Sequence, residues 1–405
     1  MKDKKIIIFS AIFVFFLFST FFIYFFKKNN EWNVGLSESE ELEKMEFLSN
    51  HTVLDLVKDD IELLDNFKLD TKSLGEKRVE FKYRLKDEKR VRNGFYIYDV
   101  IDTEKPVIFG SSSYTTTVGS KVDLLNIFIS GDMCDDTPIR RIEGEYSLND
   151  VGNYPITYVV EDKSGNIATH DFTLKVVKPS ISGGGSSTSS TKISFSDVID
   201  KYKTTDTMIG IDVSKWQGNI DWEKVKNAGS EFAIIRIGHQ KGIKGEYIID
   251  PYFKHNLENA KKNNIPVGVY FYSYADSIDE AKKQAEWIIE QLDGEKLELG
   301  ISYDWESFSL YNSINLSFYN FSNARDMFLM TVEKHGYKGM LYSSKYYLEN
   351  IWLPLEYDTW LAHYTNSTNY MGEYYLWQMC NTGRIDGISG DVDINILYKN
   401  RKNVD

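Results

Sequence analysis

Residues 301–308 read ISYDWESF, a stretch in which two carboxylates stand two positions apart among apolar and aromatic residues. Because side chains on a β-strand alternate between faces, Asp304 and Glu306 would point to one side, and Tyr303 and Trp305 to the other. Two carboxylates on one face of a half-buried strand destabilise the fold unless they are solvated or hydrogen-bonded, and such a cost is otherwise accepted where they take part in chemistry. The spacing therefore indicates either a strand end with solvated acids or an acid/base pair at the mouth of a barrel.

Further carboxylates stand near the ends of two other apolar segments. Asp212 closes MIGIDV, while Asp391 and Asp393 lie in DVDINIL. Asp212 alone would also fit a helix cap through DVS. In a parallel barrel the carboxyl ends of the strands meet at one mouth, so acids from the first, fourth and eighth segments would converge there. The recurrence predicts a catalytic cluster of Asp212, Asp304, Glu306 and Asp393, with Asp391 ranked below Asp393.

From residue 205 onward, apolar segments typical of β-strands recur, and helical patterns follow the first five. The segments are MIGIDV (208–213), EFAIIRIG (231–238), IPVGVYFYSYA (265–275), LGISYDW (299–305), KGMLYSS (338–344), TWLAHY (359–364), YYLWQM (374–379) and DVDINIL (391–397). Between them, WEKVKNAG and PYFKHNLENAKKNN carry helix-end signals, and IDEAKKQAEWIIEQL is amphipathic at the helical period. This order predicts an α/β fold, an incomplete (β/α)5(β)3 barrel over residues 205–405.

The region from about residue 207 to 398 resembles the glycoside hydrolase family 25 lysozymes, the muramidases that cut bacterial peptidoglycan. The matching stretches are GIDVSKWQGNIDW (210–222), PVGVYFYSYA (266–275), YDWE (303–306), LYSSKYYLEN (341–350), WLAHY (360–364), LWQMCNTGRIDGISG (376–390) and VDIN (392–395). An Asp-x-Glu pair alone is common in proteins. The resemblance is specific because all of these stretches occur in order at this spacing, over about half of the chain.

The resemblance implies a role for each acid. Glu306 would be the general acid that protonates the glycosidic oxygen, a task that needs a carboxyl kept protonated by apolar surroundings and neighbouring negative charge. Asp304, Asp212 and Asp393 would supply that charge and stabilise an oxocarbenium-like transition state. Members of this family are thought to retain the anomeric configuration. The nucleophile stays open between a carboxylate and the N-acetyl group of the substrate, oriented by the Asp of the pair.

Aromatic and amide side chains would hold the sugars by stacking and hydrogen bonding. The predicted substrate-binding residues are Tyr270, Tyr272, Trp360, Tyr364, Trp377 and Gln378. Tyr270, Tyr272 and Tyr274 alternate on one strand and share a face, and Tyr270 best matches the motif of the family. Packing inside the barrel is an equal alternative for each ring, and Trp360 and Trp377 favour the core. The FYSYA that follows GVY departs from the family pattern, which indicates a different subsite preference.

Composition argues against several kinds of partner. The formal net charge of −13 argues against a nucleic acid, which would need a basic face. The six histidines form no paired-ligand spacing, so neither a metal nor another cofactor is expected. Only two cysteines occur, Cys134 and Cys380, and this number argues against a disulfide framework.

An uncharged apolar run, residues 6–26, lies between lysines at both ends. About 20 apolar residues cross the hydrocarbon core of a bilayer, and a signal peptide has a shorter core followed by a small-residue cleavage site. Residues 1–28 are therefore predicted to form an uncleaved signal-anchor helix. The charges on either side mildly favour a cytoplasmic N-terminus. The bulk of this single-pass protein would then face the cell wall of a bacterium, of the Gram-positive kind.

Two segments between this anchor and the barrel resemble each other, residues 73–100 and 150–177. Both alternate apolar and polar residues on either side of a polar turn, which indicates β-hairpins. They resemble the bacterial Ig-like repeats of Gram-positive surface proteins. The prediction is a stalk with a degenerate Ig-like domain (29–102), an Ig-like domain (103–179) and a Gly/Ser-rich linker (180–204). Its Gly/Ser-rich stretch, residues 180–194, spans about 20 Å on average and would let the barrel tumble independently.

Two functions follow from these features. The first is a membrane-anchored muramidase that hydrolyses the 1,4-β bond between N-acetylmuramic acid and N-acetylglucosamine, for wall remodelling or local perforation. Its partners would be peptidoglycan glycan strands, the cytoplasmic membrane and cell-envelope machinery. The alternative is an inactive peptidoglycan-binding or assembly protein that keeps the barrel as a glycan clamp. The presence of all four acids favours the enzyme, because a binder needs no protonated carboxyl at Glu306.

Overall fold

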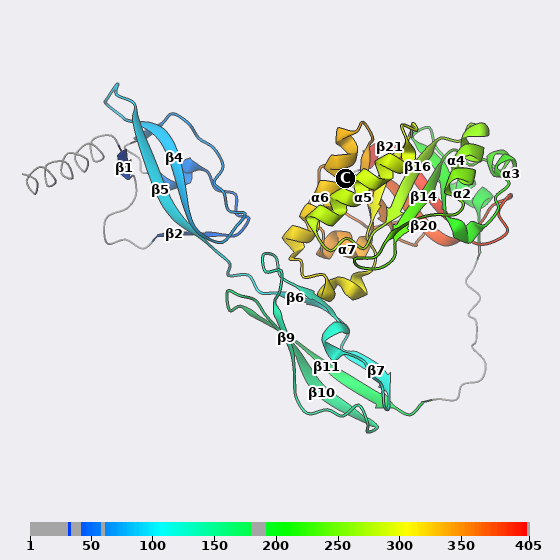
Figure 1. Cartoon of the computed structure of the whole chain (residues 1–405), viewed down its shortest axis with the longest axis horizontal. Coiled ribbons are helices and arrows are strands. Elements are labelled where there is room, and N and C mark those ends of the chain that lie inside the picture. The colour runs from blue at the N-terminus through cyan, green and yellow to red at the C-terminus, as the bar shows by residue number, and fades with distance from the viewer. Residues whose placement is uncertain (1–30, 34–41, 58–60, 180–191, 403–405) are drawn as a thin grey trace, which may run out of the picture. The chain divides into compact units, whose positions relative to one another are not determined.

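The computed structural model describes residues 31–33, 42–57, 61–179 and 192–402 (Figure 1). The chain divides into two compact units, residues 1–104 and 105–405. The predicted anchor helix and most of the predicted linker lie outside the described residues. In the described part of the chain, no helix has both the length and the apolar character needed to cross a membrane.

The first unit contains a small β-sheet in the order β1-β5-β4-β3, with β2 also paired to β5. Its elements are β1 (Glu31–Asn33), β2 (Glu43–Glu46), 3₁₀ helix η1 (Val53–Leu56), β3 (Ile61–Leu63), β4 (Gly75–Leu85) and β5 (Arg92–Ile101). Strands β4 and β5 form the predicted antiparallel hairpin. Val79, Phe81 and Tyr83 alternate along β4 and are buried, which is the apolar face that the period-two pattern indicates. The Ig-like assignment stays a prediction.

The second unit begins with another β-rich part, residues 105–179, which we call the β-module. Its elements are β6 (Val107–Phe109), β7 (Ser113–Thr117), η2 (Leu124–Asn126), β8 (Ile129–Gly131), β9 (Ile139–Glu143), β10 (Gly152–Glu161) and β11 (Ile167–Val177). The sheet order is β7-β11-β10-β9, and β6 pairs separately with β8. The predicted hairpin is β10–β11, and Asp162 closes its turn by accepting hydrogen bonds from the backbone and side chain of Asn166.

The remainder of the second unit is a closed barrel, and the barrel-like fold predicted from the sequence is confirmed. Its strands are β13 (Thr207–Val213), β14 (Ala233–Gln240), β16 (Val267–Tyr272), β17 (Gly300–Asp304), β18 (Gly339–Ser344), β19 (Asp358–Ala362), β20 (Tyr374–Arg384) and β21 (Val392–Lys402). They pair in this order, β21 pairs with both β13 and β20, and the short β15 (Tyr247–Ile249) lies beside β14.

Helices follow the first five barrel strands. They are α3 (Trp222–Asn227), α4 (Phe253–Lys262), α5 (Ile278–Leu292), α6 (Phe318–Lys334) and α7 (Lys345–Asn350), with η3 (Lys215–Gln217) and η4 (Phe308–Ser313) in the connections. The longer helices begin at residues that cap them: Ser277 accepts from the N–H of Glu280, and Ser317 from that of Asn320. Helices α5 and α6 lie side by side on the outside of the sheet (Figure 1).

The last barrel strand runs against the others, and this corrects one step of the sequence argument. Strand β21 is antiparallel to both β13 and β20, whereas the other neighbouring barrel strands are parallel. Asp393 therefore lies at the beginning of its strand and not at a carboxyl end. Because the strand is reversed, its beginning reaches the same mouth, and the register places Asp393 directly opposite Asp212.

The predicted linker also ends earlier than the sequence analysis places it. Residues 193–202, which were assigned to the linker, form β12 (Ile193–Ser194), paired with β20, and helix α2 (Phe195–Tyr202). Phe195 and Val198 are buried in the core of the barrel. This short amphipathic helix, FSDVIDKY, was not predicted because it directly follows a Ser-rich stretch. Its apolar side chains are stabilised by burial against the barrel.

Candidate active site

Acids from three strands meet at one hollow in the barrel mouth. Asp212 comes from β13, Asp304 ends β17, Glu306 follows two residues later, and Asp393 is the second residue of β21. The hollow measures about 60 Å³, and the residues that line it are Asp212, Tyr270, Asp304, Glu306, Tyr342, Trp360, Gln378 and Asp393. Asp304 is only 2% exposed and forms part of the floor, whereas Glu306 reaches solvent at the rim. The geometry therefore brings the four predicted acids together.

The alternation read from YDWES explains this placement. Tyr303 and Trp305 point away from the hollow and are fully buried. Tyr303 packs against Phe328 of α6, and the indole N–H of Trp305 donates to the carbonyl of Ala275. Because these two rings anchor the strand in the core, the intervening Asp304 is held facing the hollow.

Two side-chain amides tie the acids of β13 and β21 together. The amide nitrogen of Gln378 donates to Oδ2 of Asp212 at 2.8 Å and to Oδ2 of Asp393 at 2.9 Å. Asn395 donates to the same oxygen of Asp212 at 2.7 Å. The amide oxygens are also engaged: Gln378 accepts from the hydroxyls of Tyr342 and Tyr364, and Asn395 from the indole N–H of Trp360. These side chains form one network of hydrogen bonds, which fixes the orientation of each amide.

Burial raises the pKa values of the acids in this network. Desolvation raises the pKa of Asp212 to about 6, although hydrogen bonds from Asn395, Gln378 and Asp393 act in the opposite direction. Desolvation, and then the charge of Asp212 and a hydrogen bond to it, raise the pKa of Asp393 to about 9. The pair therefore holds a proton near neutral pH, with Asp393 donating to Asp212.

The acids of YDWES form a second coupled pair. Desolvation raises the pKa of Asp304 well above its ordinary value, and the charge of Glu306 and a hydrogen bond to it add to the rise. The pKa of Glu306 is also raised, first by desolvation within the hollow and further by Asp212, while the hydrogen bond to Asp304 opposes the rise. The two carboxyls are therefore coupled and share a proton through the hydrogen bond between them. Carboxyls that hold protons are poor ligands for a cation, so the arrangement suits acid catalysis better than metal binding.

A buried cation lies on the strand next to Tyr270. Arg236 of β14 is 8% exposed and pairs with Asp250, which is 1% exposed, at 2.7 Å. The carboxylate of Asp250 also accepts from the backbone N–H groups of Lys215 and Tyr252. The positive charge of Arg236 opposes the rise in the pKa of Asp304. This ion pair thus contributes to the electrostatic balance of the hollow.

Replacing Arg236 by Met is expected to lower the free energy of unfolding by about 3–5 kcal/mol, because Asp250 would be left as a buried charge without its cation. The matched control is Arg384→Met, since Arg384 pairs with Asp391 at the surface and such pairs contribute at most about 1 kcal/mol. Calorimetric unfolding of both variants measures the difference. Equal losses in the two variants would show that the buried pair contributes no more than the exposed one.

Replacing Asp393 by Asn is expected to stabilise the fold increasingly as pH rises. The pKa of Asp393 is higher in the folded state than the ordinary unfolded value of about 4, so the folded protein loses stability as pH rises from about 4 through about 9. An Asn there keeps a donor towards Asp212 and an acceptor for Gln378 but carries no titrating proton. The variant should gain about 1 kcal/mol or more relative to the wild type between pH 5 and pH 8. Melting curves across this range test the sign, and a gain that shrinks with pH would contradict it.

The predicted aromatic residues separate into two groups. Tyr270 and Trp360 line the hollow, with their rings edge to face at 6.0 Å, and Tyr364 is 52% exposed at its edge. Tyr272 is not among the residues that line it, and its hydroxyl lies 3.2 Å from the hydroxyl of Ser307 in the segment after Glu306. Trp377 faces the outer core, where its ring packs against Tyr202.

Asp391, which the sequence analysis ranks below Asp393, lies apart from the hollow. Its carboxylate is exposed and pairs with Lys192 at 2.8 Å and Arg384 at 2.7 Å. Hydrogen bonding to Lys192 lowers the pKa of Asp391, which leaves it ionised and unsuited to hold a proton.

Three residues of the site were missed by the sequence reasoning: Tyr342, Asn395 and Arg236. Tyr342 and Asn395 lie in stretches that match the family, LYSS and VDIN, at alternate positions that face the interior. Strand alternation from Asp393 could have identified Asn395 as its neighbour on the same face. No sequence signal marks Arg236 as a partner of Asp250, because the pairing depends on how the β14–α4 connection folds.

Comparisons with known proteins identify the family of the barrel. The family described as Glycosyl hydrolases family 25 matches residues 211–388. The uncharacterised protein YegX of Escherichia coli K12 is 30% identical over 196 residues, which cover 47% of this chain and 70% of YegX. Lysozyme M1 of Streptomyces globisporus is 28% identical over 213 residues, covering 46% of this chain and 66% of that protein.

Among solved structures, a family 25 glycosyl hydrolase from Bacillus anthracis matches with a TM-score of 0.42 and 25% identity, covering 49% of this chain and 92% of that one. The region that matches the family model, residues 211–388, contains Asp212, Asp304 and Glu306, three of the acids that line the hollow. The chain therefore belongs to glycosyl hydrolase family 25 and is a glycoside hydrolase, a muramidase.

Proposed function

We propose that this enzyme hydrolyses the 1,4-β bond between N-acetylmuramic acid and N-acetylglucosamine in peptidoglycan. The observation that carries the proposal is the placement of a solvent-reaching acid, Glu306, beside three further carboxyls in one small hollow. A glycosidic oxygen must receive a proton while positive charge develops on the neighbouring sugar carbon. The site supplies both a proton donor and negative charge within the same space.

In the proposed reaction Glu306 is the proton donor. In the free enzyme it shares a proton with Asp304, and a bound glycan strand would cover the rim and desolvate Glu306 further. This shift favours the proton on Glu306, from which it passes to the glycosidic oxygen as the bond to the sugar carbon breaks. Asp304 is then ionised, and its charge stabilises the oxocarbenium-like transition state. Water completes the hydrolysis, with Glu306 accepting its proton.

The size of the hollow favours participation by the N-acetyl group of the substrate. A hollow of about 60 Å³ has room for a few water-sized groups, which suits a substituent of the sugar ring. The acetamido group of the sugar has a suitable size. Asp304 lines the hollow, and its buried Oδ1 has no hydrogen-bond partner among the described residues, so in this proposal it accepts the amide N–H. The oxygen of the acetamido group would then attack the sugar carbon.

The test uses the full-length chain and a peptidoglycan suspension. Release of reducing ends together with a fall in turbidity supports hydrolysis, and both should be absent when Glu306 is replaced. Binding to peptidoglycan without release of reducing ends would instead support the glycan-clamp alternative.

The cellular setting is proposed from the sequence. Residues 1–28 would anchor the enzyme in the cytoplasmic membrane, and the two β-rich parts, as Ig-like domains, would form a stalk that carries the barrel into the wall. This tether suits remodelling of the cell's own wall or local perforation for envelope machinery. Membrane fractions washed with alkaline carbonate should retain the full-length protein and lose a variant without residues 6–26. Release of both proteins would contradict the anchor.

A further inference from the structure

The segment that follows the acid Glu306 is fixed first by contacts within the barrel. Residues 306–317, here named the acid loop, contain η4 and lead from Glu306 to the start of α6. Phe308 of this loop stacks on Tyr347 with ring centroids 3.4 Å apart, and it packs against Trp305. Ser307 contacts Tyr272. The position of Glu306 at the rim therefore depends on how this loop is fixed.

One side chain of the acid loop hydrogen-bonds into the backbone of the β-module. The amide nitrogen of Asn312 donates to the carbonyls of Leu125 at 3.1 Å and Phe128 at 2.7 Å, and its oxygen accepts from the N–H of Ser130 at 2.9 Å. The amide thus makes three hydrogen bonds to a part of the chain more than 180 residues away. A contact with both donors and the acceptor engaged specifies one orientation of the loop.

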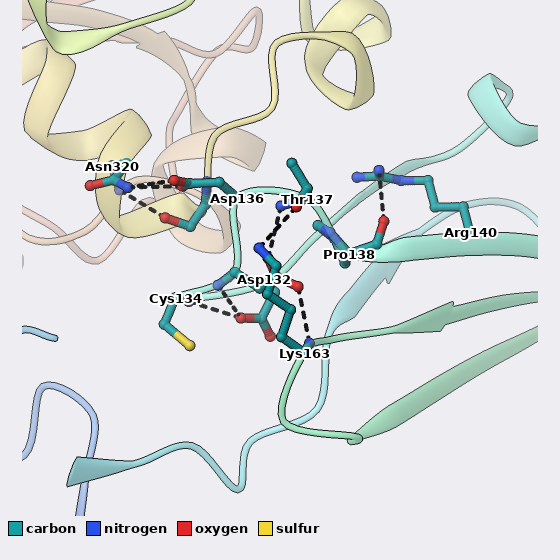
Figure 2. Close-up of polar contacts among 10 residues, drawn as sticks. Asp132, Cys134, Asp136, Thr137, Pro138, Arg140, Lys163 and Asn320 are labelled. Atoms are coloured by element: carbon teal, nitrogen blue, oxygen red, sulfur yellow. Dashed lines mark hydrogen bonds and ion pairs between the residues drawn. The ribbon is translucent and has the colours of Figure 1, made fainter. Parts of the chain in front are cut away.

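The far end of the acid loop is capped by the same module. Oδ1 of Asp136 accepts from the backbone N–H of Ser317 at 2.7 Å and from the side chain of Asn320 at 2.8 Å; Figure 2 shows the Asp136–Asn320 contact. The N–H groups of Phe318 and Tyr319 donate to backbone carbonyls of Asp132 and Met133. The first N–H groups of a helix have no partner within the helix, so the β-module supplies acceptors that α6 lacks.

The capping loop of the β-module is itself ordered by internal hydrogen bonds. Oδ1 of Asp132 accepts from the N–H group of Cys134 (Figure 2) and from that of Asp135. Asp135 in turn accepts from the N–H of Thr137 and pairs with Lys163 at 2.7 Å. A pre-ordered loop loses little conformational entropy when it contacts α6. The contact can therefore hold the acid loop in a single position.

Apolar packing completes this interface. A methyl group at Gly131 would lie 2.9 Å from the rings of both Tyr311 and Phe318, so the two parts are in close contact there. Phe109 of β6 packs against Phe318 and Tyr346. The β-module and the barrel belong to one compact unit, which differs from the independently tumbling barrel expected from the linker.

We infer that the β-module is a positioning element of the active site: Asp136 and Asn312 fix the acid loop and thereby hold Glu306 at the working geometry. Neither residue touches the reacting atoms. The expected effect on activity rests on the proposed hydrolysis of peptidoglycan. The expected effect on the order of residues 306–317 is measured without a substrate.

The test compares the full-length wild type with Asn312→Ala, Asp136→Ala and Asp136→Asn. Matched controls are Asn259→Ala, which removes an amide bonded within α4, and Asp150→Ala, which removes a surface contact with Ser147 in the β-module. Hydrogen exchange of the amides of residues 306–317 reports on loop order, and kcat, KM and the pH–rate profile on peptidoglycan fragments report on catalysis.

Both Ala variants are expected to exchange faster over residues 306–317 and to lose about ten- to a hundredfold in kcat, with KM changed less than about threefold, because a displacement of about 1 Å costs this much. The alkaline limb of the pH–rate profile should shift, since the surroundings of Glu306 change. Asp136→Asn should restore most of kcat, because its oxygen can still accept from Ser317. The two controls should match the wild type.

The inference is overturned by unchanged exchange in residues 306–317, or by faster exchange with the wild-type kcat and pH profile. A lower melting temperature alone, with kcat per folded molecule unchanged, also overturns it and leaves the β-module as structural support. A wild type that is inactive on peptidoglycan would defeat the proposed function separately, and the exchange data would still decide whether the module orders the loop.

Discussion

Full-length protein with Glu306→Gln is expected to lose about 10³-fold in kcat on peptidoglycan while keeping the wild-type fold. Gln has nearly the same shape but carries no acidic proton, and a positioned general acid contributes about 10² to 10⁴ to the rate. Glu306 reaches solvent at the rim of the hollow, where an amide can be solvated. Binding of glycan strands should therefore persist, and the loss should appear in kcat and not in KM.

The matched control is Glu290→Gln on α5, an exposed acid on the outside of the barrel, which should retain the wild-type rate. Reducing-end release over time, normalised to folded protein, measures both variants. If Glu306→Gln kept more than about a tenth of the wild-type kcat, another group in the hollow would have to be the proton donor.

Asp304→Asn is expected to lower kcat about 10²- to 10³-fold, for a different reason. An Asn at this position keeps the shape of the floor but supplies no negative charge when positive charge develops on the sugar. The substitution also removes the carboxyl that shares a proton with Glu306. Burial and the charge of Glu306 raise the pKa of that carboxyl in the wild type. The remaining activity should lose its dependence on that coupling, so the pH–rate profile of the variant should become simpler than that of the wild type.

A glycan that lacks N-acetyl groups distinguishes the two candidate nucleophiles, which are the acetamido group of the substrate and Asp304. If the acetamido group attacks, a glycan lacking N-acetyl groups should be cleaved poorly by the wild type, and Asp304→Asn should lower that small rate little further. If Asp304 itself attacks, the wild type should cleave the deacetylated glycan well and the variant should not. Asp279→Asn, an exposed acid in the first turn of α5, is the control for general loss of charge.

Much of the barrel could be predicted from the sequence because its strands are apolar on both faces and its helices carry their own end signals. The direction of β21 could not, since the alternation in DVDINIL is the same whichever way a strand runs. Helix α2 was missed for a related reason. Its eight residues form too short a pattern beside a Ser-rich stretch, and only burial of Phe195 against the barrel makes it stable.

The acids of the site could be predicted because carboxylates are costly in an apolar strand and therefore stand out. The groups that orient them, Asn395 and Tyr342, are ordinary strand residues until the register places them beside Asp212 and Gln378. Interface residues such as Asn312 give no local signal at all. Their partners lie in the β-module, and only tertiary structure brings the two together.

The most direct test of the central claim is the identity of the new reducing end. Peptidoglycan is digested with the full-length enzyme, reduced with borohydride and analysed by mass spectrometry, with Glu306→Gln as the blank. If the hollow around Asp212, Asp304, Glu306 and Asp393 works as proposed, the fragments end in reduced N-acetylmuramic acid and are absent from the blank. Fragments ending in reduced N-acetylglucosamine, or the same fragments in both digests, would contradict it.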